Sequence, residues 1–365
     1  MLQENQIVLN IDEYLNQKYP NRIKEGDRDK YFTSAQEEFN NIKRGVALRL
    51  NPSALIIKME GKDRLDFLHR VSSNSVKDLK PMDKRNTLFL NEKGRFIDRT
   101  TLITLGNETI IIGSADKQKH LYSWISKYII MEDIQLSDIT EKYLVIEIFG
   151  AQSDSFLTML FGKDIKIDDP DFVRRFDVDG FTFHFFMNQE NNGVKIYNII
   201  IEREKSIELI EHLFTTKSVF DLSFTGEDAY DKFRIENGIP AYPNEINDST
   251  NPHEVGLINE VNFKKGCYIG QEVIARLDTY DKVQKKMVRS IIDGSFPADI
   301  LPVPIIDQSG NNVGEVTTIS SMNSSNEMYG LAIIKKKNLE ENNKNLFSSN
   351  GKKLNLKVIE LNNNR

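Results

Sequence analysis

The order of predicted elements repeats along this chain, and the repeat limits the folds available to it. Each copy reads strand, helix, strands joined by tight turns, and helix, with apolar residues at the spacing of each element. The first copy has these segments: 54–59, 63–71, strands on either side of the turn 91–94, a strand after Gly106, and a helix with Leu121, Trp124 and Ile125. The second copy has these segments: 143–149, 153–161, 181–187 and 194–201 around the turn 188–193, and 206–214. The shared order, without a residue-level repeat, predicts an α+β fold with two ferredoxin-like lobes.

The ends of the chain have other patterns. The first 40 residues are polar and weakly periodic, and we expect their loss to remove little buried area. After a predicted helix that ends at Gly238 and Pro240, the chain is rich in turns up to about 285. Short β-rich runs then alternate with turns, which is typical of a small barrel. The predicted regions are a polar extension, two α+β lobes with a boundary near 140–145, and a β-barrel: 1–40, 41–284 and 285–365.

The composition is that of an ordinary soluble globular protein. Hydrophobic residues make up 39% of its 365 residues and charged residues 28%. The formal net charge of −6 gives no basic footprint for duplex binding, so we expect no nucleic-acid partner. No stretch reaches membrane-spanning length without charges, and the acidic amino terminus lacks the apolar core of a signal peptide. We therefore expect a cytoplasmic protein with no membrane partner.

The chain contains one cysteine, Cys267. A single cysteine cannot form an intrachain disulfide or supply the ligand set of a zinc or iron–sulfur site, so we expect a reducing compartment and no resident metal. Its surroundings allow two interpretations. A lone cysteine is often a small buried hydrophobe. Here, however, Lys264 and Lys265 precede it, Gly266 and Gly270 flank it, and a helix pattern follows, so nearby positive charge and a helix N-terminus would favour a reactive thiolate. We favour the interpretation of Cys267 as a reactive thiol.

Two other chemistries are less well supported. A cysteine hydrolase needs an imidazole, but the five histidines are scattered and only His253 is near Cys267 in sequence. Arg234, Glu245 and Glu254 lie in the turn-rich stretches "FRIENGIPAYPNEI" and "PHEVGL". They could bind a polar heterocycle, but composition favours an ordinary solvated connection.

The motif "KGCYIGQE" at 265–272, together with "RIENGIP" and "PHEVGL", closely resembles the folate-binding YgfZ-type proteins implicated in iron–sulfur cluster maturation. These proteins are relatives of the glycine cleavage T-protein, the aminomethyltransferase. Weaker motifs such as "LNEKGRFID" and "GNNVGEVTTISS" follow in the family's order, so the resemblance covers the chain from about residue 45. It implies a T-protein-like three-lobed body with a central folate channel and a C-terminal β-barrel.

The resemblance also implies roles for particular residues. The signature positions around the functional thiol are Lys265, Cys267, Tyr268, Gln271 and Glu272. The predicted tetrahydrofolate-binding residues are Asn74, Lys93, Arg95, Glu190 and Arg276, with the three cations as candidates for the anionic glutamyl tail.

Departures from the T-protein pattern bear on activity. The acidic turn of T-proteins is "MNQENNG" here, with Asn191 in place of the glutamate and Glu190 beside it. Their paired aspartates are Asp98 and Arg99 here. The resemblance therefore favours a tetrahydrofolate-binding accessory protein for iron–sulfur client or assembly proteins, outside the usual enzyme classes. The alternative is a folate-dependent aminomethyl or other one-carbon transferase.

Overall fold

The protein is described by a computed structural model in two compact units. The described residues are 10–116, 119–162, 169–178, 180–190, 193–293, 301–307, 309–320, 327–340, 347–349 and 352–359. Unit 1 comprises residues 1–52, 139–188 and 195–230, and unit 2 comprises the rest. Each unit therefore takes its residues from separate stretches of sequence.

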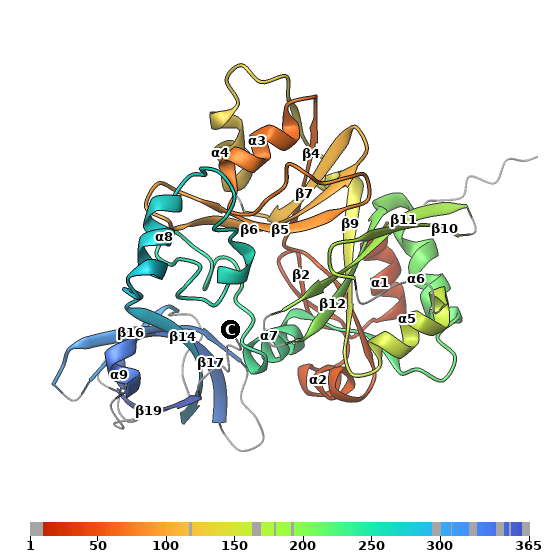
Figure 1. The fold of residues 1–365 in the computed structure, drawn as a ribbon. Coiled ribbons are helices and arrows are strands. Elements are labelled where there is room, and N and C mark those ends of the chain that lie inside the picture. Colours follow the sequence, from red (N-terminus) through yellow and green to blue (C-terminus); the bar gives the residue numbers. More distant parts are fainter. Residues whose placement is uncertain are drawn as a thin grey trace, which may run out of the picture. The chain divides into compact units, whose positions relative to one another are not determined.

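Unit 1 is built on a six-stranded sheet with the order β10-β11-β12-β9-β3-β13 (Figure 1). These strands are Val173–Val178, Phe181–Gln189, Lys195–Glu202, Tyr143–Phe149, Val46–Leu50 and Leu222–Phe224. Strand β3 pairs antiparallel with β9 and parallel with β13. Strand β3 therefore inserts an early segment of the chain into the sheet of the second predicted lobe.

The apolar core of unit 1 joins this sheet to its helices. The helices are α1 (Ile11–Lys18), α2 (Ala35–Arg44), α5 (Ser153–Phe161), α6 (Ser206–Thr215) and the start of α7 (Glu227–Glu236), with 3-10 turns at Thr140–Lys142 and Arg203–Lys205. Side chains from α1, α5 and α6 pack with those of β3, β9, β11 and β12 in one cluster. The apolar stripes of α1, α5 and α6 are thus buried against the sheet.

The amino-terminal segment corrects one expectation. Residues 10–40 include α1 and a small hairpin of β1 (Ile23–Glu25) and β2 (Arg28–Tyr31). Leu15 is 1% exposed and Phe32 is 3% exposed, and both belong to the core of unit 1. The expectation that this segment buries little area is therefore wrong for its described part.

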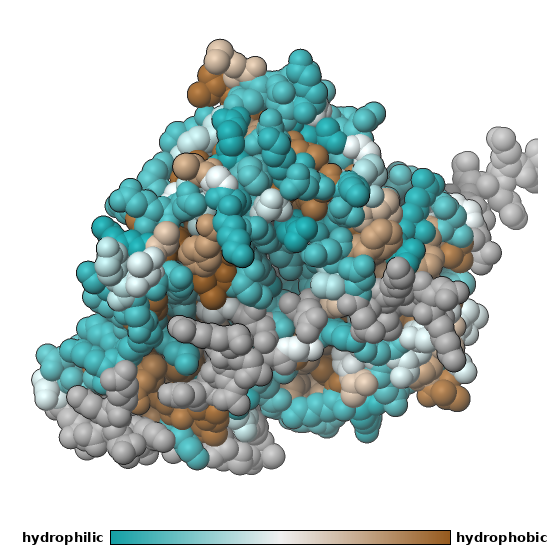
Figure 2. All heavy atoms as spheres, viewed as in Figure 1, coloured by the Kyte–Doolittle hydropathy of each residue, from teal (hydrophilic) through white to brown (hydrophobic). Residues whose placement is uncertain are grey.

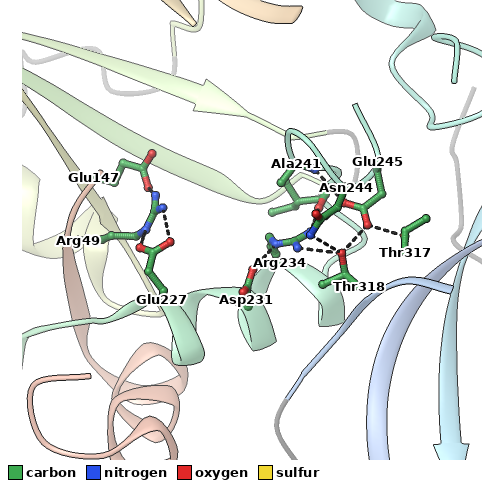
Figure 3. Close-up of polar contacts among 11 residues, drawn as sticks. Arg49, Glu147, Glu227, Asp231, Arg234, Ala241, Asn244, Glu245, Thr317 and Thr318 are labelled. Carbon is green, nitrogen blue, oxygen red and sulfur yellow. Dashed lines mark hydrogen bonds and ion pairs between the residues drawn. The ribbon is translucent and has the colours of Figure 1, made fainter. Parts of the chain in front are cut away.

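Unit 1 also buries a cluster of charges. Arg49 of β3 donates to Glu147 of the neighbouring β9 at 2.6 Å and to Glu227 of α7 at 2.7 Å (Figure 3). Its guanidinium lies 3.8 Å from the ring centroid of Tyr230. Burial opposes the charge of Arg49, but Glu227 and Glu147 outweigh this effect and raise its pKa.

Unit 2 contains a five-stranded sheet with the order β5-β6-β7-β4-β8. These strands are Lys84–Leu90, Phe96–Leu105, Glu108–Ser114, Ala54–Glu60 and Gln135–Asp138. Helices α3 (Arg64–Val71) and α4 (His120–Tyr128) cover it, and their apolar residues share a core with the strands (Figure 1). If β3 is left out, the strand order of unit 1 is the same: β10, β11, β12, β9 and β13 correspond to β5, β6, β7, β4 and β8. This correspondence is expected for two related α+β lobes.

The carboxy-terminal part of unit 2 forms a six-stranded sheet with the order β15-β16-β17-β14-β19-β18. These strands are Val303–Ile306, Asn312–Ile319, Glu327–Lys335, Lys285–Asp293, Lys352–Ile359 and Phe347–Ser349, and α9 (Lys336–Glu340) follows β17. Cα atoms of the end strands β15 and β18 approach within 8 Å. The predicted β-rich region thus curls back on itself.

The turn-rich segment contains a buried ion pair, which is hydrogen-bonded to this sheet. Arg234 of α7 donates to Glu245 at 3.0 Å and to Thr318 of β16 at 3.0 Å (Figure 3). Glu245 is fully buried and also accepts from Thr317. Composition favoured a solvated connection here, and that interpretation is wrong because Arg234 and Glu245 satisfy each other inside the protein.

The face of the molecule drawn in Figure 2 is mostly hydrophilic, with apolar residues in small separate groups. Among the described residues, the large apolar side chains that remain exposed include Ile130, Met131, Val219 and Phe263. None of the helices in the described ranges is both long and apolar enough to cross a membrane.

Candidate functional site

Two predicted motifs meet in unit 2. Gly270 precedes α8 (Gln271–Thr279) and has a φ of +85°. A Cβ at Gly270 would lie 2.5 Å from the carbonyl oxygen of Asn91 and 3.1 Å from Cα of Gly94. Gly94 in turn has a φ of +67°, and a Cβ there would lie 3.0 Å from Ile274 of α8. Glycine is therefore required at Gly270, where the backbones of the "NEKG" hairpin and the start of α8 touch. At Gly94, the positive φ and the close side chain of Ile274 favour glycine.

Cys267 lies on the loop before α8, and its side chain is exposed. The predicted helix after it is confirmed by α8, which begins four residues later at Gln271. Gln271 is half-buried, and its backbone N–H donates to the carbonyl of Tyr268 at 3.2 Å, while Glu272 is exposed in the first turn. The structure thus excludes the interpretation of Cys267 as a small buried hydrophobe.

The two signature residues that flank Gly266 and Cys267 point into the protein. Lys265 donates through Nζ to the carbonyls of His69, Ser72 and Asn74. Burial lowers the pKa of Lys265 to about 8, although carbonyls that accept from the charged form oppose this shift. Tyr268 is 7% exposed, and burial raises its pKa to about 12. Its hydroxyl has no hydrogen-bond partner among the described residues.

Asn74 follows α3 and is joined to strand β5. Its side-chain amide donates to the carbonyl of Asn86 at 2.9 Å, and its side-chain oxygen accepts from the backbone of Ser75 at 2.8 Å. Its backbone N–H donates to Thr87 at 2.9 Å. These bonds fix the side chain of Asn74 against the edge strand of the sheet.

The three predicted cations have different surroundings. Lys93, in the hairpin, and Arg276, in the last turn of α8, are exposed. Arg95 instead donates to Glu254 at 2.7 Å and to the carbonyl of Ser249 at 2.9 Å. Because Glu254 is 5% exposed, this ion pair holds the hairpin to the "PHEVGL" loop.

Glu190 belongs to a cluster of buried charges that sequence reasoning did not assemble. Arg99 of β6 donates to Glu190 at 3.1 Å, and it donates to Glu260 through two nitrogens at 2.9 and 2.6 Å. Glu260 ends the 3-10 turn η4 (Ile258–Glu260). Burial raises the pKa of Glu260, with the charge of Arg99 opposing it, and the two carboxylates together hold the pKa of Arg99 above its usual value despite burial.

Arg99 and Glu260 are functional candidates that the sequence analysis missed. The available signal was Asp98-Arg99, a charged pair inside the apolar strand "FIDRTTLITL". Asn191, which replaces the T-protein glutamate, lies outside the described residues.

Asp98 has a different environment from Arg99. A register shift after Phe89 in the pairing of β5 with β6 indicates a bulge just before Asp98. Asp98 is 1% exposed and accepts from the backbone of Ser114 at 2.6 Å, from the Ser114 hydroxyl at 2.9 Å and from the Arg99 backbone at 2.8 Å. Burial raises the pKa of Asp98 to about 6, although the hydrogen bonds from Ser114 oppose the shift. This carboxyl is therefore occupied by protein donors.

Comparison with curated proteins finds transferases that are similar to this chain. A protein of Arabidopsis thaliana named as a chloroplastic transferase is 25% identical over 283 residues, which is 77% of this chain and 63% of that protein. Aminomethyltransferases of Staphylococcus carnosus and Staphylococcus haemolyticus are 21% and 23% identical, with 91% of this chain and 90% of each relative aligned.

The fold comparison gives the same relationship. The crystal structure of the glycine cleavage system aminomethyltransferase T from Bartonella henselae superposes with a TM-score of 0.77 at 17% identity, covering 96% of each chain. It confirms the predicted T-protein-like α+β fold. The family model described as the GCVT N-terminal domain matches residues 11–265, including most of the segment expected to lie outside the resemblance. This match covers more than half of the sequence, and the chain therefore belongs to the family of the glycine cleavage T-protein.

Proposed function

We propose that this protein binds a reduced folate and supports the assembly or repair of iron–sulfur clusters in client enzymes, with Cys267 as its functional thiol. The observation that carries the proposal is the exposure of Cys267 on a loop next to the buried Tyr268, within a motif that resembles the YgfZ-type proteins. An exposed thiolate can bind the iron of a cluster in transit, or it can attack a disulfide of a partner protein to form a mixed disulfide, with the other sulfur of that disulfide leaving as a thiolate.

The residues present fit a folate in their chemistry. A pterin presents a donor–acceptor edge, and the carboxylates of Glu190 and Glu260 offer buried acceptors, because their oxygens can accept further hydrogen bonds besides those from Arg99. The glutamyl tail is anionic, and Lys93 and Arg276 are exposed cations on contacting elements. Arg95 is a weaker candidate because Glu254 already binds it. When bound, tetrahydrofolate would supply a carrier for a one-carbon unit.

Cys267→Ser tests the thiol and the folate separately. In a deletion strain, we expect the variant to fail to restore the activity of [4Fe-4S] enzymes, while the purified variant binds tetrahydrofolate like the unchanged protein by calorimetry. The exchange is nearly isosteric at an exposed position, so it should cost little stability. Full complementation by the serine variant would exclude the thiol role. Absence of both binding heat and a thermal shift when tetrahydrofolate is added to the unchanged protein would exclude the folate.

The family relationship favours one alternative, a folate-dependent aminomethyl or other one-carbon transferase. The occupied carboxyl of Asp98 weighs against it, because a group that accepts three protein hydrogen bonds is poorly placed to accept a substrate proton. The discriminating assay offers the purified protein tetrahydrofolate, an aminomethyl donor and a carrier protein. Release of ammonia at an enzymatic rate would favour the transferase.

A further inference from the structure

The loop that carries Cys267 is fastened on its amino-terminal side by one ammonium group. Lys265 Nζ donates to the carbonyl of Ser72 at 2.5 Å, to that of Asn74 at 2.9 Å and to that of His69. An ammonium group has three N–H donors, so all of them are used. The acceptors follow one another at the carboxyl end of α3, where the helix dipole also favours a cation.

Further contacts fix the same loop. The side-chain oxygen of Asn262 accepts from the backbone of Lys264 at 2.9 Å and of Lys265 at 3.1 Å. The backbone N–H of Asn262 donates to the carbonyl of Ser73 at 3.0 Å. On the other side, Tyr268 lies in a core with side chains from α7, α8 and β14. The exposed span between these two fixed sides is therefore Gly266 and Cys267.

The space around this span is open. A Cβ added to Gly266 would have no atom within 4 Å among the described residues. The two-residue span thus presents the thiol to an incoming molecule, while its position is set by residues on either side. Of these, Lys265 connects the loop to the segment of Asn74, a residue predicted to bind folate.

We propose that Lys265 is a positioning residue, which holds the Cys267 loop on the end of α3 and the Asn74 segment, and that it does not act as the charge that activates the thiol. This inference rests on the proposed function of Cys267. It replaces the expectation from sequence that Lys264 and Lys265 both favour the thiolate. The reason is geometric, because the ammonium of Lys265 is surrounded by carbonyls of another segment.

The test compares Lys265→Met with Lys264→Met in the full chain. Both variants remove one positive charge from the same loop, but Lys264 is exposed. We expect amide hydrogen exchange at 262–268 to rise about tenfold or more in Lys265→Met, because hydrogen bonds from a charged group are lost. Lys264→Met should change exchange by less than about twofold. Unchanged exchange in Lys265→Met would overturn the proposal.

The pH profile of Cys267 alkylation by iodoacetamide separates positioning from activation. Positioning predicts the same midpoint in Lys265→Met as in the unchanged protein, whereas activation predicts an upward shift. An upward shift in Lys265→Met would overturn the proposal. If Lys265→Met does not fold, Lys265→Arg retains the charge but replaces a compact ammonium by a planar group. We expect faster exchange in this variant too, and normal exchange would overturn the proposal.

Complementation of the deletion strain links the inference to function. We expect Lys265→Met to lose support of [4Fe-4S] enzymes while its thiol still reacts, and Lys264→Met to retain support. Full support by Lys265→Met would contradict the positioning role. Full support by Cys267→Ser would instead refute the proposed function, and the exchange experiment would still decide whether Lys265 anchors the loop.

Discussion

Each unit holds an arginine between two glutamates, but the two clusters are built from different kinds of element. Arg49 lies on β3, directly opposite Glu147 on β9, and its other partner is Glu227 at the first turn of α7. All three belong to regular secondary structure. Arg99 lies on β6, but its partners come from a turn after β11 and from the short turn η4. The side chain of Arg49 is 5% exposed and that of Arg99 is 17% exposed.

The difference indicates that an arginine between two glutamates can either stabilise a sheet or hold loops together. The Arg49 cluster joins elements that the sheet already aligns, so we assign it to the stability of unit 1. The Arg99 cluster joins Glu190 to Glu260, and Glu260 is followed within seven residues by Cys267. We therefore propose that it holds loops in place near the proposed site.

Arg49→Met gives the largest expected effect. The variant leaves Glu147 and Glu227 without their shared cation in a buried site, so we expect a loss of about 3–5 kcal/mol in the free energy of unfolding. Urea denaturation measures the loss. Arg44→Met is the matched control, because Arg44 is an exposed arginine in a weak ion pair of the same unit, and it should cost less than about 1 kcal/mol. Equal losses in the two variants would show that burial does not set the strength of the Arg49 cluster.

Arg99→Met tests whether the Arg99 cluster holds loops near the proposed site. Its partners lie on turns that can move apart, so we expect a smaller loss of about 2–3 kcal/mol. Tetrahydrofolate affinity should fall about tenfold or more, since Glu190 and Glu260 would no longer be held together. Urea denaturation and calorimetry give the two quantities. A loss as large as that of Arg49→Met, with normal folate affinity, would make both clusters structural.

Much of the fold could be predicted from the sequence because it depends on local patterns. The repeated element order, the hairpin at 91–94 and helix α8 follow from periodicity and turn residues. Leu15 and Phe32 gave a weaker signal, because each lies in a short, mostly polar segment, and the sequence does not show that this segment packs on the sheet of unit 1.

The candidate site was less predictable because it depends on contacts between distant residues. The motif identified Cys267 and Lys265, but the direction of the Lys265 side chain is set by carbonyls almost 200 residues earlier. Likewise, Arg99 meets Glu190 and Glu260 across 91 and 161 residues. No rule on sequence spacing shows that such distant residues meet, whereas the chemical properties of each residue type can be inferred from the sequence.

Asp98→Asn gives the smallest effect and compares the two strands themselves. The neighbours of Arg49 on β3 are Leu48 and Leu50, whereas Arg99 has a buried carboxyl beside it. Burial raises the pKa of Asp98 to about 6 from an ordinary value of 3.8, so the folded protein binds a proton more tightly than the unfolded chain does. The stability from this proton is fully present below the ordinary pKa of 3.8 and is lost as the pH rises through about 6.

The amide of the Asp98→Asn variant does not titrate. The free energy of unfolding of the wild-type protein, relative to that of the variant, should therefore fall by about 1 kcal/mol between pH 5 and pH 7. Urea denaturation of both proteins at several pH values measures this difference. A difference that is constant with pH would mean that the hydrogen bonds from Ser114 and Arg99 fully offset the burial of Asp98, and that β6, like β3, carries no unbalanced charge.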